Sequence, residues 1–345
     1  MINRSFWKNK KVLITGFSGF KGFWLSLFLT ELGSDVYGIS KKNVSSEIYN
    51  EFSKKNKYKN NFELDIYSRD KLHQVLEKIQ PNIIFHLAAQ SLVIKSKLDP
   101  YETINSNIIG SFNLLHWIST NSTKITTVVA TTDKVYKFPQ KNNVETDPLG
   151  SFELYGATKV SLENIIDSFN KDKNSLNKFS VIRSGNVLGG GDGGDNRILT
   201  DVLSAIKSQS EIYLRNPDSI RPWQHVLDSI SGYVLTAQYS ELTNNFEKFN
   251  LNSDQNNEFN VFELTKKLVD RFGFDNTIKI DKNSNYVESK ELRIDSSKAM
   301  KLLAWKPQNN IDDIVEKIYD WEKAKDEGNV ESISINQIKE YLENT

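Results

Sequence analysis

The sequence predicts an α/β fold, namely a doubly wound parallel sheet with a smaller, partly interleaved C-terminal domain. Short β-branched runs alternate with longer amphipathic stretches through the first half of the 345 residues. The runs are apolar throughout, which is typical of parallel strands that are covered by helices on both faces. After residue 186 this regular alternation ends, and a glycine-rich stretch at 189–195 is followed by less regular helices and short strands.

The predicted elements follow one another in the order that this fold needs. Each strand candidate is rich in Val, Ile, Phe or Thr, and each helix candidate is an amphipathic stretch between two such runs. Parallel strands joined by helices place their carboxyl ends on one edge of the sheet, where such folds bind ligands. The predicted strands are 11–16, 35–40, 62–66, 82–89, 125–132 and 179–184, and the predicted helices lie near 20–32, 69–79, 101–119 and 153–170.

Composition excludes several classes of protein. The 44 Lys and Arg residues balance 44 Asp and Glu residues, so charge gives no reason to expect nucleic acid or an anionic membrane as partner. The chain has no cysteine, and no His/Asp/Glu cluster has metal-ligand spacing, so no metal is predicted. No stretch approaches the roughly 18 apolar residues that span a bilayer, and the start lacks the apolar core of a signal peptide. We therefore expect a cytoplasmic protein.

A glycine triplet indicates a dinucleotide cofactor. The stretch TGFSGFKG places Gly16, Gly19 and Gly22 after the first predicted strand and at the start of a helix. Glycines in this position permit a tight turn and let the backbone approach a pyrophosphate at the helix N-terminus. The strand before the triplet and the helix after it provide the context that this interpretation requires.

The adenosine end of the expected site lacks one common determinant. An acidic residue that binds the ribose hydroxyls of NAD usually ends the second strand, but here Ser40 is followed by Lys41 and Lys42. The two lysines suit a 2′-phosphate or solvent equally, so this position leaves NAD and NADP open. Asp65 and Ile66 end the third predicted strand and suit the adenine edge, although Asp65 is equally suited to capping a loop.

Two pairs of residues carry the expected chemistry. Asp133 and Lys134 follow the apolar fifth strand in the stretch TTDKVY. In YGATK, Tyr155 and Lys159 stand four residues apart on a predicted helix, so their side chains face the same way. An ammonium group one helical turn from a phenol, beside a cationic nicotinamide, lowers the pKa of the phenol and makes it a usable base. The structural alternatives are a surface ion pair and an amphipathic helix with a snorkelling lysine.

Together these motifs resemble the extended short-chain dehydrogenase/reductase family, and several of them resemble its CDP-glucose 4,6-dehydratase members. The resemblance covers roughly residues 5 to 325. Two positions depart from the pattern, because Gly193 stands where a tryptophan is expected and Thr200 where a proline is expected. The matching segments are the glycine turn, FHLAAQ (85–90), SNIIG with Asn107, TTDKVY, the Tyr155–Lys159 pair, RSGNVLGGGD (183–192), IRPWQHVLD (220–228) and LRIDSSKAMKLLAWKP (292–307).

The resemblance implies NAD-dependent 4,6-dehydration of CDP-glucose to CDP-4-keto-6-deoxyglucose. Tyr155 takes the C4 hydroxyl proton while hydride passes to NAD⁺, and Thr132 hydrogen-bonds the same oxygen. Lys134 is the candidate base for the C5 proton, and Asp133 donates a proton to the departing C6 hydroxyl. Other 4,6-dehydratases carry Thr-Asp-Glu at this strand end, whereas epimerases typically have small residues after the threonine. Hydride return to C6 makes the net reaction a redox-neutral lyase reaction.

The resemblance also assigns binding residues, Lys159 and Tyr155 among them. A nucleoside diphosphate needs Arg and N–H donors, for which Arg197, Arg221 and Asn186 are candidates, with His225 as a supporting hydrogen-bonding residue. The cofactor contacts are expected from Gly16, Gly19, Phe20, Gly22, Asp65, Ile66, Ala88, Ala89, Gln90, Asn107, Tyr155 and Lys159.

On this basis residues 1–186 and about 224–250 are expected to form the dinucleotide-binding domain. Residues 187–223 and about 251–325 are expected to bind the sugar nucleotide, and 326–345 to form a polar, loosely attached tail. The resemblance further implies a homodimer through the helices near 101–119 and 153–170, and a role in deoxysugar synthesis for lipopolysaccharide. Two alternatives stay open: a 4-epimerase or dehydratase for another nucleotide sugar, and a non-catalytic NAD-binding regulator.

Overall fold

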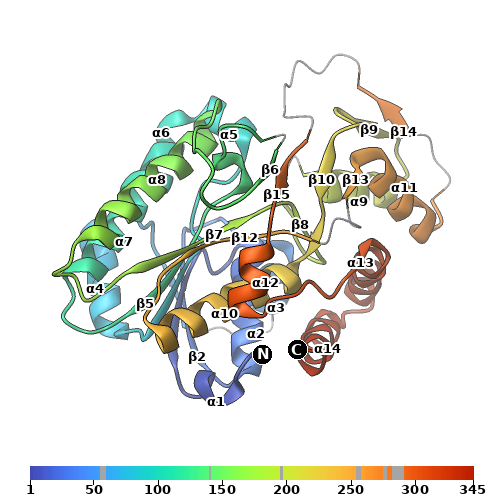
Figure 1. Cartoon of the computed structure of the whole chain (residues 1–345). Coiled ribbons are helices and arrows are strands. Elements are labelled where there is room, and N and C mark those ends of the chain that lie inside the picture. Colours follow the sequence, from blue (N-terminus) through green and yellow to red (C-terminus); the bar gives the residue numbers. More distant parts are fainter. Residues whose placement is uncertain (55–59, 140, 195–196, 254–257, 275–277, 282–290) are drawn as a thin grey trace.

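The computed structural model describes residues 1–54, 60–139, 141–194, 197–253, 258–274, 278–281 and 291–345, and its centre is a parallel sheet (Figure 1). Seven strands pair in the order β12-β7-β5-β4-β1-β2-β3, and every neighbouring pair is parallel. This arrangement confirms the doubly wound fold. The strands are β1 (Lys11–Thr15), β2 (Asp35–Ser40), β3 (Asn61–Glu63), β4 (Ile83–His86), β5 (Thr126–Ala130), β7 (Phe179–Ser184) and β12 (Lys248–Leu251).

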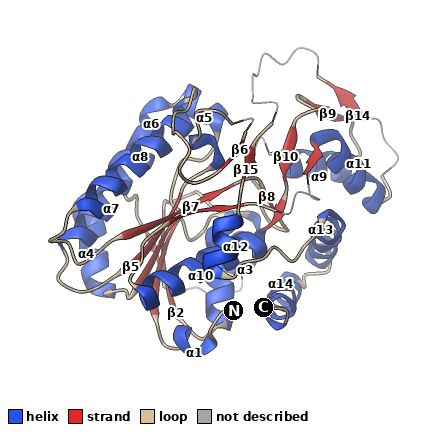
Figure 2. Ribbon diagram, viewed as in Figure 1, coloured by secondary structure: helices blue, strands red, loops and turns tan. Residues whose placement is uncertain are grey.

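Helices cover both faces of this sheet, so that the strands lie enclosed between them (Figure 2). One face packs its apolar side chains against α2, α3, α10, α12 and α14, and the other packs against α4, α7 and α8. Burial on both faces explains why the strand sequences are apolar without alternation. The bounds are α2 (Phe20–Glu31), α3 (Glu47–Ser53), α10 (Val226–Thr243), α12 (Ser297–Leu303) and α14 (Val330–Glu343), and α4 (Arg69–Ile79), α7 (Ser111–Thr120) and α8 (Leu154–Lys171).

The single helix expected at 101–119 is divided into three parts. A short helix, α6 (Pro100–Ile104), begins at a proline in its first turn and is capped by the side chain of Asp99. A π-helical segment (Asn105–Gly110) follows and then leads into α7. Gly110 ends the wide turn where a Cβ atom would lie 2.6 Å from the side chain of Ile66. A π-helical turn inside a longer helix often marks a functional position.

A second group of elements lies beside the sheet and has its own apolar core (Figure 1). Three helices and a set of short strands build this core around Trp223, Leu264 and Ile314. The helices are α9 (Ile198–Ser208), α11 (Val261–Phe272) and α13 (Ile311–Asp326), and the strands are β8 (Val187–Leu188), β9 (Ile212–Leu214), β10 (Ile220–Pro222), β11 (Gln224–His225), β13 (Glu258–Asn260) and β14 (Ile278–Ile280). The remaining elements are α1 (Arg4–Trp7), α5 (Val93–Leu98), the 3₁₀ turn η2 (Asp133–Val135), β6 (Asn142–Asn143) and β15 (Arg293–Ile294).

The C-terminal segment corrects one expectation, because α14 is not loosely attached. Its side chains Val330, Ile338 and Tyr341 are buried in the same apolar core as α2 and α10. The Tyr341 hydroxyl lies 2.8 Å from the Ser231 hydroxyl of α10. The apolar residues recur at helical spacing, so a sequence that is polar on average still presents one apolar face.

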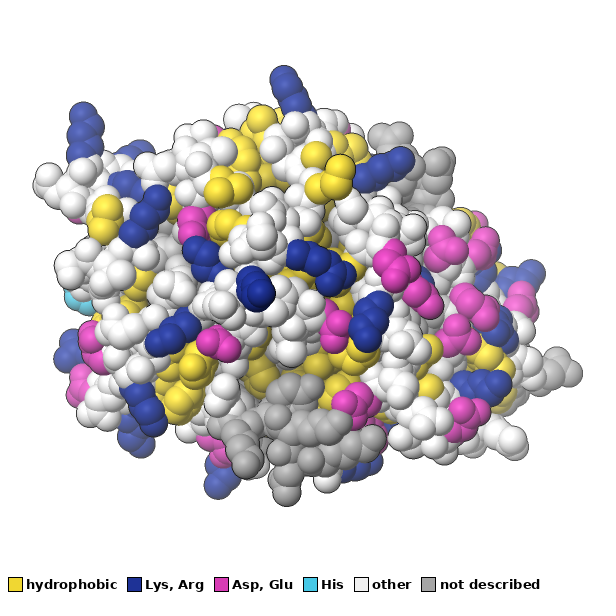
Figure 3. Space-filling model, turned by 90° about the horizontal axis from the view of Figure 1, so that it is seen from below, with side chains coloured by type: hydrophobic (Ala, Val, Ile, Leu, Met, Phe, Trp, Pro, Cys, Tyr) yellow, Lys and Arg dark blue, Asp and Glu magenta, His cyan; other side chains and the backbone are white. Residues whose placement is uncertain are grey.

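The face of the molecule seen from below carries mixed charge (Figure 3). Seen from below, Lys and Arg side chains are interspersed with Asp and Glu side chains (Figure 3). This mixture agrees with the formal net charge of zero. Within the described ranges, no helix is both long and apolar enough to cross a membrane.

Candidate active site

A cleft of about 620 Å³ runs past the carboxyl ends of β1, β4, β5 and β7. It gathers residues from the glycine turn, the strand ends, α8 and the second core, which lie far apart in the sequence. This is the edge where a doubly wound sheet is expected to bind its ligands. The predicted site residues that line it are Gly16, Gly19, Phe20, Gly22, Asp65, Ile66, Ala88, Ala89, Gln90, Thr132, Asp133, Lys134, Tyr155, Lys159, Asn186, Arg197 and Arg221.

The glycine turn packs so closely against its own backbone and against Ala88 that side chains at Gly16 and Gly22 would clash. Gly16 has φ +74°, and a Cβ atom there would lie 2.8 Å from the Ala88 amide nitrogen. A Cβ atom on Gly22 would lie 2.1 Å from the Gly16 carbonyl oxygen. Helix α2 begins behind Gly19, which has no side chain to cap the first amide groups. These amide groups therefore fit the pyrophosphate of a dinucleotide.

At the adenosine end, Lys41 is bound by two carboxylates. Its ammonium nitrogen lies 2.6 Å from Glu102 Oε1 and 3.2 Å from Asp65 Oδ2. The hydrogen bond with Glu102 is the main reason that the pKa of Lys41 is raised. Asp65 also accepts a hydrogen bond from the Tyr67 amide at 3.0 Å, so it caps the loop as well as lining the cleft. The second lysine considered for this end, Lys42, does not line the cleft.

The 3₁₀ turn after β5 presents the acid and the lysine to the cleft. Thr132 Oγ1 accepts a hydrogen bond from the Lys134 amide at 3.3 Å and donates one to Asp133 Oδ1 at 3.0 Å. Lys134 Nζ lies 3.7 Å from the same Asp133 oxygen. Asp133 is buried, and its second oxygen, Oδ2, has no hydrogen-bond partner within the described part of the chain. A buried, unsatisfied oxygen that lines a cleft is available to a ligand.

Tyr155 and Lys159 lie beside this turn on α8. Burial raises the pKa of Tyr155, and the Thr132 hydroxyl opposes that increase. Lys159 Nζ donates a hydrogen bond to the Ala130 carbonyl at 3.1 Å. Burial, followed by repulsion from Lys21, lowers the pKa of Lys159 to about 7. The predicted pair thus lies where the phenol and the ammonium group both face the end of β5.

The sequence prediction missed Lys21 and Tyr233, which lie close together near this end of the cleft. Lys21, in the first turn of α2, lines the cleft, and burial followed by the charge of Arg197 lowers its pKa to about 8. Its ammonium lies 3.5 Å from the Tyr233 hydroxyl and 5.6 Å from the centre of that ring. A lysine in the first turn of a helix is unfavourable, because the helix dipole is positive at that end. This unfavourable placement was the feature of the sequence that could have indicated a functional role for Lys21.

Three of the residues expected to bind the substrate, Asn186, Arg197 and Arg221, also line the cleft. Arg197 forms an ion pair with Asp192 and donates to Ser91 Oγ at 3.4 Å. Arg221 is buried and donates to the Ile220 carbonyl at 2.8 Å. Asn186 accepts a hydrogen bond from the Gln224 amide through its carbonyl at 3.1 Å.

The structure also accounts for the two positions that depart from the family pattern. Gly193 has φ +64°, a conformation that strains any other residue, and a Cβ atom there would lie 3.0 Å from Glu47. The Thr200 hydroxyl lies within hydrogen-bond distance of the Gly194 and Arg197 carbonyls, at 2.5 and 3.0 Å. Gly193 therefore permits a backbone conformation that other residues disfavour, and the Thr200 hydroxyl contacts two nearby carbonyl groups.

Asn107 and His225 do not line the cleft. Asn107, in the π-helical segment, accepts from the Gln90 amide at 2.8 Å and donates to the Gln90 carbonyl at 3.0 Å. It therefore holds a cleft residue in place without facing the cleft itself. His225 caps α10 by accepting from the Leu227 amide at 3.3 Å, and burial lowers its pKa to about 3. Among the residues that the structure describes, no group of three His, Cys, Asp or Glu side chains has a metal-binding arrangement.

Sequence comparisons agree with the motifs. The family model described as GDP-mannose 4,6-dehydratase matches residues 13–318. A CDP-glucose 4,6-dehydratase from Salmonella typhimurium is 33% identical over 336 residues, which cover 94% of this chain and 93% of that protein. A GDP-mannose 4,6-dehydratase from Vibrio cholerae is 28% identical over 253 residues, which cover 68% of this chain and 66% of that protein.

Structural comparisons support the fold. The epimerase Mth375 from Methanothermobacter thermautotrophicus superposes with a TM-score of 0.82 at 21% identity, covering 94% of this chain and 95% of that one. A UDP-glucose 4-epimerase from Thermotoga maritima superposes with a TM-score of 0.79 at 21% identity, covering 91% and 99% of the two chains. At this level of identity the structural likeness speaks for the fold, whereas the sequence matches speak for the family.

Proposed function

Because the chain belongs to the GDP-mannose 4,6-dehydratase family of nucleotide-sugar enzymes, we propose that it catalyses the NAD-dependent 4,6-dehydration of CDP-glucose. One observation carries this proposal. Asp133 and Lys134 line the same cleft as Tyr155 and Lys159, so an acid and a candidate base for elimination lie beside the pair that suits alcohol oxidation. The similarity to a CDP-glucose 4,6-dehydratase over 94% of the chain supports the choice of nucleotide.

The cleft residues fit NAD. Gly16, Gly19 and Gly22 would hold its pyrophosphate, because their close backbone packing forms a tight turn that only residues without side chains permit, at the start of α2. At the adenosine end, Asp65 and Glu102 together outweigh the single charge of Lys41, which disfavours a 2′-phosphate and supports NAD over NADP. When bound, NAD would supply the hydride acceptor for oxidation at C4 and the hydride donor for reduction at C6.

Tyr155 and Lys159 perform the proton transfer that accompanies oxidation at C4. The Tyr155 hydroxyl oxygen receives the C4 hydroxyl proton, for which its burial-raised pKa must be lowered by a neighbouring cation. Lys159, one turn along α8, supplies that cation when it is protonated. The Thr132 hydroxyl hydrogen-bonds the same substrate oxygen, as its closeness to Tyr155 supports.

Asp133 and Lys134 perform the elimination. With a ketone at C4, the C5 hydrogen becomes acidic, and Lys134 Nζ accepts that proton in its neutral form. Asp133 donates a proton from Oδ2, the oxygen without a described partner, to the C6 hydroxyl, which leaves as water. The C5–H and C6–O bonds break together with formation of the C5–C6 double bond. The elimination requires one proton in total on the two side chains, whose Lys134 Nζ and Asp133 Oδ1 atoms are 3.7 Å apart.

The test is incubation of purified protein and NAD⁺ with CDP-, dTDP-, GDP- and UDP-hexoses in separate reactions, followed by mass spectrometry of the products. We expect CDP-glucose alone to lose one water. Dehydration of another nucleotide sugar would overturn the substrate, and an unchanged mass with inversion at C4 would overturn the reaction. Retained NAD binding without any turnover would instead support a non-catalytic regulator.

We also propose a homodimer that forms through the helices near 101–119 and 153–170, with the neighbouring α5. Five apolar side chains on this surface are exposed to solvent: Leu98, Tyr101, Ile104, Ile109 and Phe112. Contiguous exposed apolar groups of this kind favour association between chains. Light scattering on the purified protein distinguishes a dimer from a monomer, and the double substitution Leu98→Glu/Tyr101→Glu is expected to give monomers.

The proposed roles of the two parts of the chain and the proposed biological process follow from the same function. We propose that residues 1–186 and about 224–250 hold the cofactor while 187–223 and about 251–325 hold the sugar nucleotide. The product, a 4-keto-6-deoxyhexose linked to a nucleotide, suits deoxysugar synthesis for lipopolysaccharide in the cytoplasm. We expect Arg221→Ala to lose nucleotide-sugar binding and to keep NAD binding. This result would support the division of the chain into two binding regions.

A further inference from the structure

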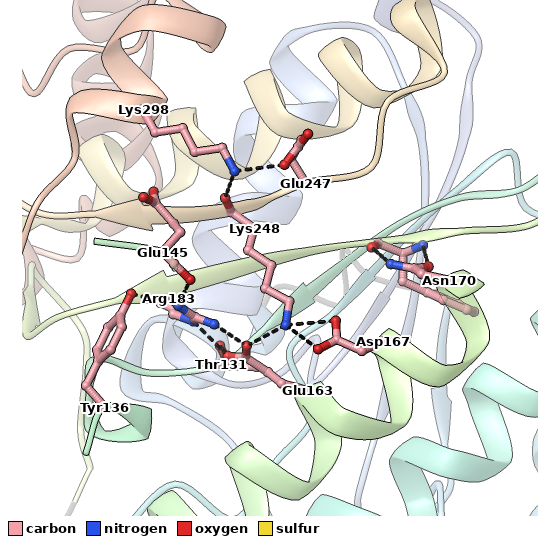
Figure 4. Close-up of polar contacts among 11 residues, drawn as sticks. Thr131, Tyr136, Glu145, Glu163, Asp167, Asn170, Arg183, Glu247, Lys248 and Lys298 are labelled. Atoms are coloured by element: carbon pink, nitrogen blue, oxygen red, sulfur yellow. Dashed lines mark hydrogen bonds and ion pairs between the residues drawn. The ribbon is translucent and has the colours of Figure 1, made fainter. Parts of the chain in front are cut away.

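An ionic network that the proposed mechanism does not use joins α8 and β7 next to Thr131 and Tyr136 (Figure 4). Its centre is the pair of Glu163 on α8 and Arg183 on β7, both of which are shielded from solvent. Arg183 Nε donates to Glu163 Oε1 at 2.9 Å, and Arg183 Nη2 donates to Glu163 Oε2 at 2.5 Å. Such a two-pronged contact fixes both side chains in one orientation.

This pair holds both ends of the segment that carries the catalytic turn. At the first end, Thr131 Oγ1 donates a hydrogen bond to Glu163 Oε1 at 2.8 Å. At the second end, Arg183 Nη1 donates to the Tyr136 hydroxyl at 2.7 Å, and the Tyr136 hydroxyl donates to Asn250 Oδ1 at 2.7 Å. Thr132, Asp133 and Lys134 lie between these two anchors, so the network limits how the turn moves relative to α8.

The same carboxylate lies on the catalytic face of α8. Tyr155, Lys159 and Glu163 follow one another at intervals of four residues and are all buried, so they share one side of the helix. Lys159 is faced by Lys21 of α2 and His86 of β4, and the carboxylate of Glu163 is the negative charge that acts on it. Burial and Lys21 lower the pKa of Lys159, and Glu163 acts in the opposite direction.

We propose that Glu163 and Arg183 are positioning residues for the dehydration: they fix the turn that carries Asp133 and Lys134, and they maintain a negative charge behind Lys159. The inference rests on the proposed function. Neither Glu163 nor Arg183 lines the cleft itself, and the pair acts through Tyr136 and through Thr131 and Lys159, which do line it. Its bidentate geometry also explains why the burial of two charges is tolerated at this place, since each has its counter-charge.

The first test measures the charge effect in a way that does not need turnover. Glu163→Gln keeps the shape of the side chain and removes its charge. We expect the pKa of Lys159, measured by competitive acetylation of its amine across pH and mass spectrometry, to fall by about one unit. The alkaline limb of kcat, which falls as Lys159 loses its proton, should move to lower pH by the same amount. An unchanged Lys159 titration would overturn the electrostatic part of the proposal.

Asp167→Asn is the matched control for this measurement. Asp167 is the next acidic residue along the same face of α8, and it shares Lys248 with Glu163: Lys248 Nζ lies 2.8 Å from Asp167 and 3.3 Å from Glu163. It is partly exposed and lies two helical turns from Lys159. We expect Asp167→Asn to leave the Lys159 titration and kcat unchanged. An equal shift in both variants would assign the effect to the loss of any nearby charge, and would overturn a specific role for Glu163.

The second test concerns the anchoring of the turn and does not depend on whether Glu163→Gln folds. Thr131→Val and Tyr136→Phe each remove one anchoring hydroxyl and keep the packing volume. We expect about a tenfold lower kcat in each, with an unchanged Kd for NAD⁺ and an unchanged pH profile. Full kcat in both variants would overturn the anchoring role. If the wild-type protein dehydrates none of the nucleotide sugars, the proposed function fails, whereas the acetylation measurement still decides the inference.

Discussion

The lysines at the two ends of the cleft have pKa values that are shifted in opposite directions. At the adenosine end, Lys41 is partly exposed and bound by two carboxylates, and its pKa is raised. At the catalytic end, Lys21 and Lys159 are removed from water, and burial lowers their pKa values to about 8 and about 7. Paired charges near the surface serve recognition, whereas at Lys21 and Lys159 burial outweighs the carboxylates that act on them, so these amines are set to change protonation state near neutral pH.

At the catalytic end, a large loss of dehydration is expected from replacement of Asp133, the proposed acid. Asp133→Asn keeps the hydrogen bond with Thr132 but cannot supply a proton to the C6 hydroxyl. General acid catalysis contributes roughly 10²- to 10⁴-fold, so we expect kcat for dehydration to fall by about a thousandfold. Oxidation at C4 should persist, so NADH absorbance should accumulate in the variant. Loss of NADH formation together with dehydration would contradict the separation of the two steps.

The burial of Lys159 predicts a cost in stability. Its folded-state pKa of about 7 lies below its ordinary value of 10.5, so between these values the unfolded chain holds a proton that the folded chain lacks. The contribution of this group therefore destabilises the fold at neutral pH, and stability should rise as pH increases from about 7 toward 10. We expect Lys159→Met to stabilise the apoprotein at pH 7 by on the order of 2 kcal/mol, while it abolishes turnover.

Urea unfolding at pH 7 and pH 9 checks this expectation. The difference between Lys159→Met and wild type should be larger at pH 7 than at pH 9, because the wild-type penalty shrinks as the solution pH rises. Lys41→Met, at the other end of the cleft, is the control and should show no such gain. A Lys159→Met protein that is less stable than wild type at both pH values would contradict the assignment.

Lys21 lowers the pKa of Lys159, whereas Glu163 raises it, so removal of the two charges is expected to shift this pKa in opposite directions. Lys21 repels the ammonium of Lys159, so its removal should raise the pKa of Lys159. For Lys21→Met we expect the alkaline limb of kcat to move to higher pH by about half a unit to one unit. The same competitive acetylation of Lys159 provides the measurement. A shift toward lower pH would mean that Lys21 acts through the shape of the cleft rather than through its charge.

The sequence predicted most of the sheet, and the exceptions have physical reasons. Six of the seven strands lie within or overlap the predicted runs, because fully buried strands are apolar along their length. The edge strand β12 was missed since KFNL is short and carries a lysine and an asparagine. The apolar face of α14 was missed because average polarity hides a helical stripe.

The site was predicted where one local motif carries several groups, and missed where tertiary contacts assemble them. The glycine turn, TTDKVY and YGATK each place their residues at one strand or helix end, and all three lie in the cleft. Tyr233 and Arg183 come from other elements, and only the folded chain brings them to Lys21 and Glu163. The spacing of Glu163 four residues after Lys159 was the one local signal of the network.

The smallest expected effect lies at the adenosine end and tests cofactor choice. Glu102→Gln removes one of the two carboxylates that bind Lys41 and leaves Asp65 in place. A less neutralised Lys41 should then tolerate a 2′-phosphate better, so we expect the ratio of Kd for NADP⁺ to Kd for NAD⁺ to fall about threefold. The effect is small because the group is partly exposed and screened by salt. Isothermal titration at low and high salt measures both affinities. A preference for NADP⁺ already in the wild-type protein would show that the two lysines after β2, rather than the carboxylates around Lys41, govern this end of the cleft.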